Sequence, residues 1–111
     1  MKNTIEYSDF DKLDFRVGKI ISASSPDWSE KLLEFKVDFG PEIGEKMILS
    51  GVKKWYIPSD FEGKLFPFIV NLAERKMGEG ISQGMMLMVD DQDQPRPIQI
   101  DQGLTVGSVL R

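Results

Sequence analysis

Hydrophobic and polar side chains alternate along much of the chain with a period of two, which is the period of a β-strand. The clearest stretch runs from Leu33 to Phe39, where every odd position is apolar and every even position is charged. Because successive side chains of a strand point to opposite faces, this stretch predicts a strand with one buried and one solvated face. Several such stretches separated by turn residues favour an all-β chain.

Four further strands are predicted at residues 14–23, 46–50, 64–70 and 85–89. In the first, the apolar residues at odd positions predict the buried face, and Gly18 predicts a bulge or bend. Pro67 lacks a backbone N–H, so its strand is expected at an edge or with irregular pairing. The last strand is apolar on both faces and is expected to be covered on both.

The segments between the strands predict two helical turns and two loops. Ser8 is placed to cap a single turn at Ser8–Asp11, and Pro58–Phe61 begins with a residue suited to a helix start. Loops are expected at residues 71–81 and 90–97, which contain glycine, proline and polar residues. The C-terminal tail is expected to pack on this subunit or on a partner through Leu104, Val106, Val109 and Leu110.

Five strands, a short helical insertion between the third and the fourth, and a C-terminal extension match the order of an OB-fold, a five-stranded Greek-key barrel. The chain has 111 residues, and we expect residues 1–111 to form a single domain. A core of this size is small, so a second subunit would stabilise it.

The composition removes most catalytic chemistry. The chain contains no cysteine and no histidine, which excludes disulfides, Cys/His zinc sites, histidine bases and catalytic triads. We therefore predict a non-enzymatic protein without a cofactor. No apolar run reaches the roughly 20 residues of a membrane span, and the first residues lack an apolar signal core. These features favour the cytoplasm.

The charge is unevenly distributed. The formal net charge is −4, yet residues 46–76 carry six Lys or Arg against three Asp or Glu. Salt screens charges beyond about 8–10 Å, so a local group of cations attracts phosphates even on an acidic protein. We therefore expect a cationic rim formed by Lys46, Lys53, Lys54, Lys64, Arg75 and Lys76.

Cations and aromatic residues stand together just after the third strand. Lys53 and Lys54 precede Trp55 and Tyr56. This combination predicts phosphate contacts beside a surface on which an unpaired base stacks. The alternative is that the aromatic rings pack against the end of the barrel.

A second group of candidates surrounds the 71–81 loop. Arg75 and Lys76 are predicted phosphate contacts, because an OB barrel presents ligand-binding surface near this loop. Asn71, Ser82 and Gln83 are predicted to contact bases or sugars, and the alternative is hydrogen bonding within the loop.

Three cations in the first half of the chain complete the candidates. Arg16 and Lys19 lie in the first strand and are predicted either to contact RNA or to form ion pairs with Asp14 or Asp38. Lys31, at the start of the second strand, is a further predicted phosphate contact.

Segments along the whole chain resemble the EMAP-II-like tRNA-binding domains. The resemblance is carried, in order, by Asp9–Phe10, Leu13–Ile20, Ser29–Leu33, Lys36–Gly40, Ser50–Tyr56, Asn71–Leu72, Arg75–Met77, Ser82–Met85 and Gly107–Arg111. It implies an OB barrel with a C-terminal extension, a stand-alone tRNA-binding protein, and a homodimer.

The resemblance departs from the family pattern in the 71–81 loop. Glu74 stands where the family has proline, Glu79 is acidic, and a second basic residue near position 78 is missing. These changes predict fewer phosphate contacts. Two alternatives implied by the resemblance are an accessory subunit of a methionyl-tRNA synthetase and a CsaA-type chaperone. The chaperone would bind unfolded polypeptides along the apolar tail and a groove lined by Phe61, Phe66 and Phe68.

Overall fold

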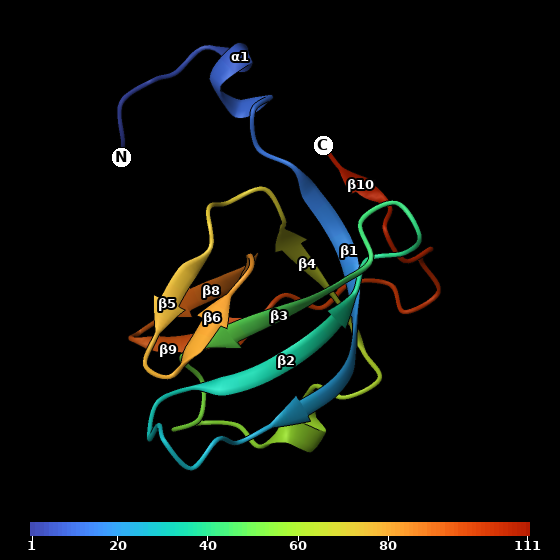
Figure 1. The fold of residues 1–111 in the computed structure, drawn as a ribbon. Helices are drawn as coiled ribbons and strands as arrows, with labels where there is room; N and C mark the ends of the chain where they lie inside the picture. Colours follow the sequence, from blue (N-terminus) through green and yellow to red (C-terminus); the bar gives the residue numbers. More distant parts are fainter.

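The chain folds into a nearly closed antiparallel barrel, described by a computed structural model over all of residues 1–111 (Figure 1). The main sheet has the strand order β3-β2-β1-β4-β7. In addition, β10 pairs with the start of β1, on the side opposite β4. Its strands are β1 (Phe15–Ser24), β2 (Leu33–Asp38), β3 (Glu45–Ser50), β4 (Leu65–Ile69), β7 (Met85–Met86) and β10 (Val109–Leu110). The predicted OB-type barrel is confirmed.

The barrel closes where β3 approaches the chain just before β7. Met47 O accepts a hydrogen bond from the backbone N–H of Gln83, at 2.8 Å. Met47 N donates to Gln83 Oε1 at 2.8 Å, and Leu49 N donates to Ser82 Oγ at 3.0 Å. Two side-chain oxygens therefore take the place of strand carbonyls along the edge of β3.

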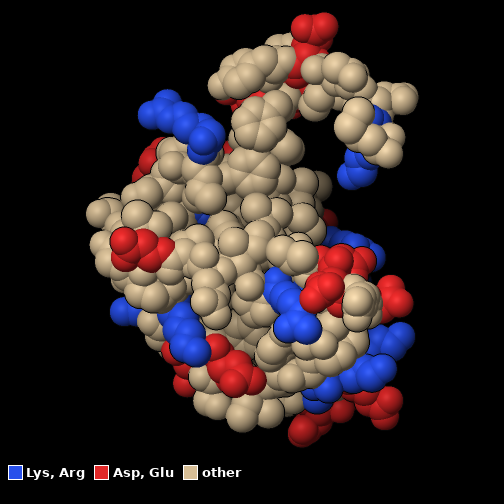
Figure 2. Space-filling model, turned by 180° about the vertical axis from the view of Figure 1, so that it is seen from behind, with Lys and Arg blue, Asp and Glu red and all other residues tan.

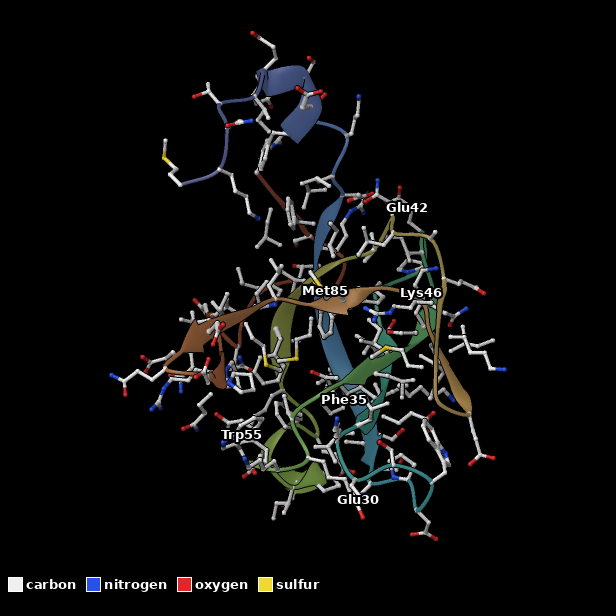
Figure 3. All side chains as sticks on the ribbon, turned by 90° about the vertical axis from the view of Figure 1, so that its left-hand side faces the viewer. Glu30, Phe35, Glu42, Lys46, Trp55 and Met85 are labelled. Atoms are coloured by element: carbon white, nitrogen blue, oxygen red, sulfur yellow. The ribbon has the colours of Figure 1, made fainter.

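Aromatic side chains fill the interior of the barrel. Phe35 and Phe61 lie with ring centroids 4.8 Å apart, and Phe39 meets Phe68 edge-on at 5.2 Å. Figure 3 shows Phe35 between the strands. The odd residues of β2 from Leu33 to Val37 are all buried, which confirms the predicted inward face of this strand.

The buried face of β1 differs from the prediction. The register against β2 shifts between Ile20 and Ser22, so Ile20 is fully buried while Ile21 is 40% exposed. The irregularity thus lies beyond Gly18. Gly18 instead faces the interior, where an added Cβ would lie 2.6 Å from Phe39 Cε1 and 2.7 Å from Val37 Cγ1.

Pro67 is accommodated because its missing N–H is not needed. It lies opposite Val17, whose backbone groups bond instead to Ser108 O and Gly107 N. On the other side, the ladder between β4 and β7 covers only Phe68 and Ile69. The predicted irregular pairing is confirmed.

Two predicted loops are hairpins instead. Residues 71–81 contain β5 (Arg75–Met77), which pairs with β6 (Gly80–Ser82). Residues 90–97 lie in β8 (Met88–Asp91) and β9 (Gln94–Pro97), joined by a turn in which Gln92 and Asp93 both have positive φ. The sequences of such short strands, which contain polar residues, do not show a period-two pattern of apolar positions.

The predicted strand at 85–89 is wrong in extent. It breaks at Leu87 into β7 and β8. Met85 is 47% and Val89 52% exposed, so the expected cover on both faces is missing.

Both helical turns are present, one of them shifted. α1 (Tyr7–Phe10) begins one residue before Ser8, and Asp9 Oδ2 accepts a hydrogen bond from Glu6 N at 3.3 Å. The 3₁₀ turn η1 (Pro58–Asp60) lies between β3 and β4 as predicted. No helix here has the length and apolar character needed to cross a membrane.

The C-terminal segment returns to the first strand. β10 pairs with β1 through Phe15–Leu110 and Arg16–Val109, and Gly107 N donates to Val17 O at 2.8 Å. The predicted packing of the tail is confirmed for this pairing, while Leu104 remains 42% exposed.

The packing around Gly18 predicts a destabilised Gly18→Ala variant. A methyl group there would contact three buried side chains at under 3 Å, and overpacking of this kind costs about 1–3 kcal/mol. We expect urea denaturation to show this loss in the free energy of unfolding. Gly51→Ala is the control, because an added Cβ at Gly51 meets nothing within 4 Å. Equal stability of the two variants would contradict the packing.

Candidate nucleic-acid interface

The cations of the middle third do not form one rim. Lys46 lies near the start of β3, whereas Lys53 and Lys54 follow its end. Figure 3 shows the labelled Lys46 level with Met85, and Trp55 lower and on the other side of the barrel. A strand rises about 3.3 Å per residue, so these cations are too far apart to share one phosphate group.

Four exposed cations lie on the segments that meet near the carboxyl end of β3, and we call them the loop cluster: Lys31, Lys54, Arg75 and Lys76. Lys53 N donates to Lys31 O at 3.2 Å, which joins the segment after β3 to the segment before β2. A cleft of about 270 Å³ is lined by Ser50, Gly51 and Arg75, which brings β5 to the same end.

The loop cluster is available to a ligand. All four of its residues are exposed. None of them takes part in an ion pair, since the ion pairs of the structure use Lys12, Arg16, Lys36 and Arg96. Acidic residues lie next to it in sequence, at Glu30, Glu74 and Glu79, so the local field is only moderately positive.

Lys53 is half-buried, and its side chain is hydrogen-bonded within the protein. Its Nζ donates to the backbone oxygen of Pro26 at 2.9 Å and to that of Ser29. These bonds tie the segment after β3 to the loop between β1 and β2. The ammonium group is therefore engaged, unlike that of Lys54, which lies 5.4 Å from the ring centroid of Trp55.

Arg16 lies at the opposite end of the barrel in a structural ion pair. Its guanidinium donates to Asp14 Oδ1 at 2.7 Å, to Glu42 Oε2 at 3.0 Å and to Gly107 O at 3.2 Å. Hydrogen bonds to the two carboxylates raise the pKa of Arg16. Its side chain is only 12% exposed, and the second carboxylate is Glu42 rather than the expected Asp38.

Lys19 is exposed on β1, away from the loop cluster. It lies opposite Asp38 of β2 and Leu65 of β4 in the sheet. No ion pair with Asp38 forms, so the side chain faces solvent on the outside of the barrel.

The polar candidates of the 71–82 region are engaged within the protein. Asn71 Oδ1 accepts from Asp14 N at 2.8 Å, and its amide donates to Lys12 O. Ser82 is 4% exposed and donates to Gly84 O, besides accepting from Leu49 N. These contacts follow the alternative in which such side chains bond to the backbone.

Gln83 and Tyr56 are also tied into the fold. Gln83 bonds to both backbone groups of Met47 and donates from its amide to Glu74 Oε1 at 3.2 Å. The Tyr56 hydroxyl donates to Pro95 O at 3.0 Å, and its ring meets Phe61 edge-on at 5.5 Å. Tyr56 thus packs against the core, as in the packing alternative.

Trp28 is a residue of this region that the sequence pattern does not reveal. This half-buried residue lies in the loop between β1 and β2 and contacts the glycines of the β5–β6 hairpin. The only signal in the sequence is the pair Gly78 and Gly80 with one residue between them. That pattern does not say which side chain fills the space.

Charges of both signs lie side by side on the face seen from behind. Figure 2 shows Lys and Arg beside Asp and Glu over this face, with several of both kinds together at its lower right margin. No group of three or more carboxylates is placed to hold a metal ion. Because its four cations are exposed and take part in no ion pair, the loop cluster suits an anionic polymer.

Comparisons with known proteins agree with this fold. Residues 15–109 match the family model described as "Putative tRNA binding domain". The chain is 40% identical over 111 residues to the methionine–tRNA ligase of Chromobacterium violaceum, with 96% of this chain covered. It is 37% identical over 90 residues to that of Dichelobacter nodosus. The matches span only 16% and 13% of those ligases.

Solved structures show the same barrel over nearly the whole chain. A MetRS-related protein from Pyrococcus horikoshii matches with a TM-score of 0.92 and 29% identity, covering 99% of this chain and all of that one. The CsaA chaperone of Picrophilus torridus matches with a TM-score of 0.87 and 26% identity, covering 97% of this chain. With the family model matching from the first strand to the last, the chain belongs to the tRNA-binding domain family.

Proposed function

We propose that the protein is a non-catalytic, cytoplasmic tRNA-binding protein whose contact surface is the loop cluster. The observation that carries this proposal is that three separate segments, which carry four exposed cations without ion pairs, meet at one end of the barrel. Lys and Arg bind phosphates, and Arg can in addition stack on a base. Membership of the family supports tRNA as the RNA.

The outer face of the sheet favours folded RNA over a single strand. OB-folds commonly lay single strands across the second and third strands. Here the outward residues of β2 and β3 include Glu34, Asp38 and Glu45, and Lys36 is paired with Glu45 at 3.3 Å. Carboxylates repel a phosphate backbone, so RNA is held at the loops rather than across the sheet.

The loop cluster predicts salt-sensitive binding of tRNA. Removing two cations with Arg75→Ala plus Lys76→Ala should weaken binding and reduce the slope of log K against log salt by about 1.4–1.8. The measurement is a gel shift with total tRNA across a salt series. Lys19→Ala plus Lys46→Ala is the matched control, because it removes two cations that lie near the start of β3, away from the loop cluster. The same slope in the Arg75→Ala plus Lys76→Ala variant and the unaltered protein would refute this surface.

We further propose that the protein is a homodimer joined through its N-terminal arm, residues 1–13. Every residue of the arm is exposed, and Figures 1 and 2 show it standing away from the barrel. Ile5 is 61%, Tyr7 69% and Leu13 41% exposed. Exposed apolar side chains on an arm that stands away from its own barrel are typical of an interface. A dimer would present two loop clusters to one RNA.

The arm predicts a specific route to the monomer. Ile5→Ser with Tyr7→Ser should convert a particle of twice 12.6 kDa into one of 12.6 kDa, because the lost apolar area no longer holds the subunits together. Light scattering during gel filtration measures the mass. Ile57→Ser removes an equally exposed side chain beside η1 and should leave the dimer intact. A monomeric unaltered protein would disprove the dimer.

A groove gives a second candidate function, the binding of unfolded polypeptides. It has a volume of about 610 Å³ and is lined by Tyr56, Phe61, Phe66 and Ile100, with Lys64 and Arg96 at its sides. Phe68, expected to line such a groove, is fully buried against Phe39, and Phe61 and Phe66 are buried as well, so the accessible apolar lining comes from Tyr56 and Ile100. A hollow lined by apolar and polar side chains suits an extended peptide.

The groove and the loop cluster can be separated by one substitution. If polypeptides are the ligand, Ile100→Ser should weaken binding of an unfolded, fluorescently labelled polypeptide about tenfold, as expected for the loss of a buried aliphatic contact. It should leave tRNA binding unchanged. Fluorescence anisotropy measures both. Polypeptide binding that is absent, or that is insensitive to Ile100→Ser, would exclude the groove. The remaining alternative, an accessory subunit of a methionyl-tRNA synthetase, is recognised by co-purification with that enzyme.

A further inference from the structure

The β5–β6 hairpin is pressed against Trp28 at its tip. Gly78 and Glu79 form the turn, and Gly78 has a φ of +62°, a conformation that favours glycine. A Cβ on Gly78 would lie 2.5 Å from Trp28 Cζ3, and one on Gly80 would lie 3.1 Å from Trp28 Cζ2. The indole thus occupies the space that side chains at both glycines would need.

The loop that carries Trp28 is itself held in place. Ser29 Oγ accepts hydrogen bonds from Lys31 N at 3.2 Å and Leu32 N at 3.1 Å. Lys53 Nζ bonds to the carbonyls of Pro26 and Ser29 on either side of Trp28. The indole is therefore presented from a fixed loop.

The base of the hairpin is fixed as well. Ser82 and Gln83 bond to β3, and Leu49 of β3 lies under Gly80, 2.9 Å from where its Cβ would be. With tip and base both held, Lys76 and Ile81 face away from the barrel, since Ile81 is 51% exposed and pairs with Lys76. Arg75 lies at the cleft on the other face of the hairpin.

We infer that Trp28 is a positioning residue for RNA recognition. It joins the loop between β1 and β2 to the hairpin between β4 and β7, the two connections that flank the ligand face of an OB-fold. The contact fixes the spacing between Lys31 on one connection and Arg75 and Lys76 on the other. This inference rests on the proposed tRNA-binding function and adds the element that makes the loop cluster rigid.

A rigid spacing has a consequence for specificity. Phosphates of a folded RNA stand at fixed distances, and cations held at matching distances bind them without an ordering cost. A flexible single strand adapts to cations at any spacing and gains little from rigidity. Trp28 therefore selects folded over unstructured RNA.

The test compares two RNAs on variants of the 111-residue chain. Trp28→Ala should weaken binding of total tRNA about tenfold and change binding of an oligouridylate by less than twofold. Trp28→Phe should restore part of the tRNA affinity, because a phenyl ring fills part of the space. Leu104→Ala, which truncates an exposed side chain elsewhere, should affect neither RNA.

A second measurement examines the contact without RNA. In Trp28→Ala, hydrogen exchange should speed up at least tenfold at the amides of residues 76–81 and remain unchanged in β1, β2 and β4. In a Trp55→Phe background, Trp28 is the single indole of the chain, and its fluorescence should change when tRNA binds.

The outcomes separate this inference from the function on which it rests. Unaltered protein that fails to bind tRNA overturns the proposed function. If tRNA binds, equal affinity of Trp28→Ala and the unaltered protein overturns the role of Trp28. Equal losses for tRNA and oligouridylate also overturn it, because they indicate a general structural defect. Unchanged exchange at residues 76–81 overturns the contact itself.

Discussion

The structure depends on how one exposed sheet edge is closed. β3 presents the N–H groups of Met47 and Leu49 toward a region where β7 is too short to pair with them. Buried N–H groups without partners are costly, and an open edge invites aggregation. The side-chain oxygens of Gln83 and Ser82 accept these hydrogen bonds and complete the barrel. Closure therefore comes from two polar side chains and not from a full strand ladder.

This constraint decides which polar residues are left for a ligand. The side-chain oxygens of Ser82 and Gln83 accept hydrogen bonds from β3, and that of Asn71 accepts one from Asp14, just before β1. Arg16 holds Asp14 and Glu42, and Lys53 holds a loop. The four cationic side chains of the loop cluster remain free of ion pairs. That division favours the proposed recognition by charge and spacing over the reading of individual bases.

The sequence predicted the barrel well because burial sets the pattern of its long strands. The alternation from Leu33 to Phe39 needs no tertiary information, and the structure has the predicted order of long strands. The hairpins and the break at Leu87 were missed, since strands of two to four residues are defined by their partners. Only part of the candidate site could be predicted from the sequence. The sequence identifies both Lys53 and Lys54 as cations. Only the fold shows that Lys53 is hydrogen-bonded to two backbone carbonyls.

The pairing of β10 with the start of β1 brings the first and last strands of the barrel side by side, as Figure 1 shows. A barrel whose first and last strands are neighbours can be attached to another polypeptide at either end with little disturbance of its interior. The same adjacency makes a circularly permuted version feasible, with a short linker joining β10 to the start of β1 and new ends opened in an exposed turn. Modularity of this kind accords with the small share of the methionine–tRNA ligases that the barrel occupies.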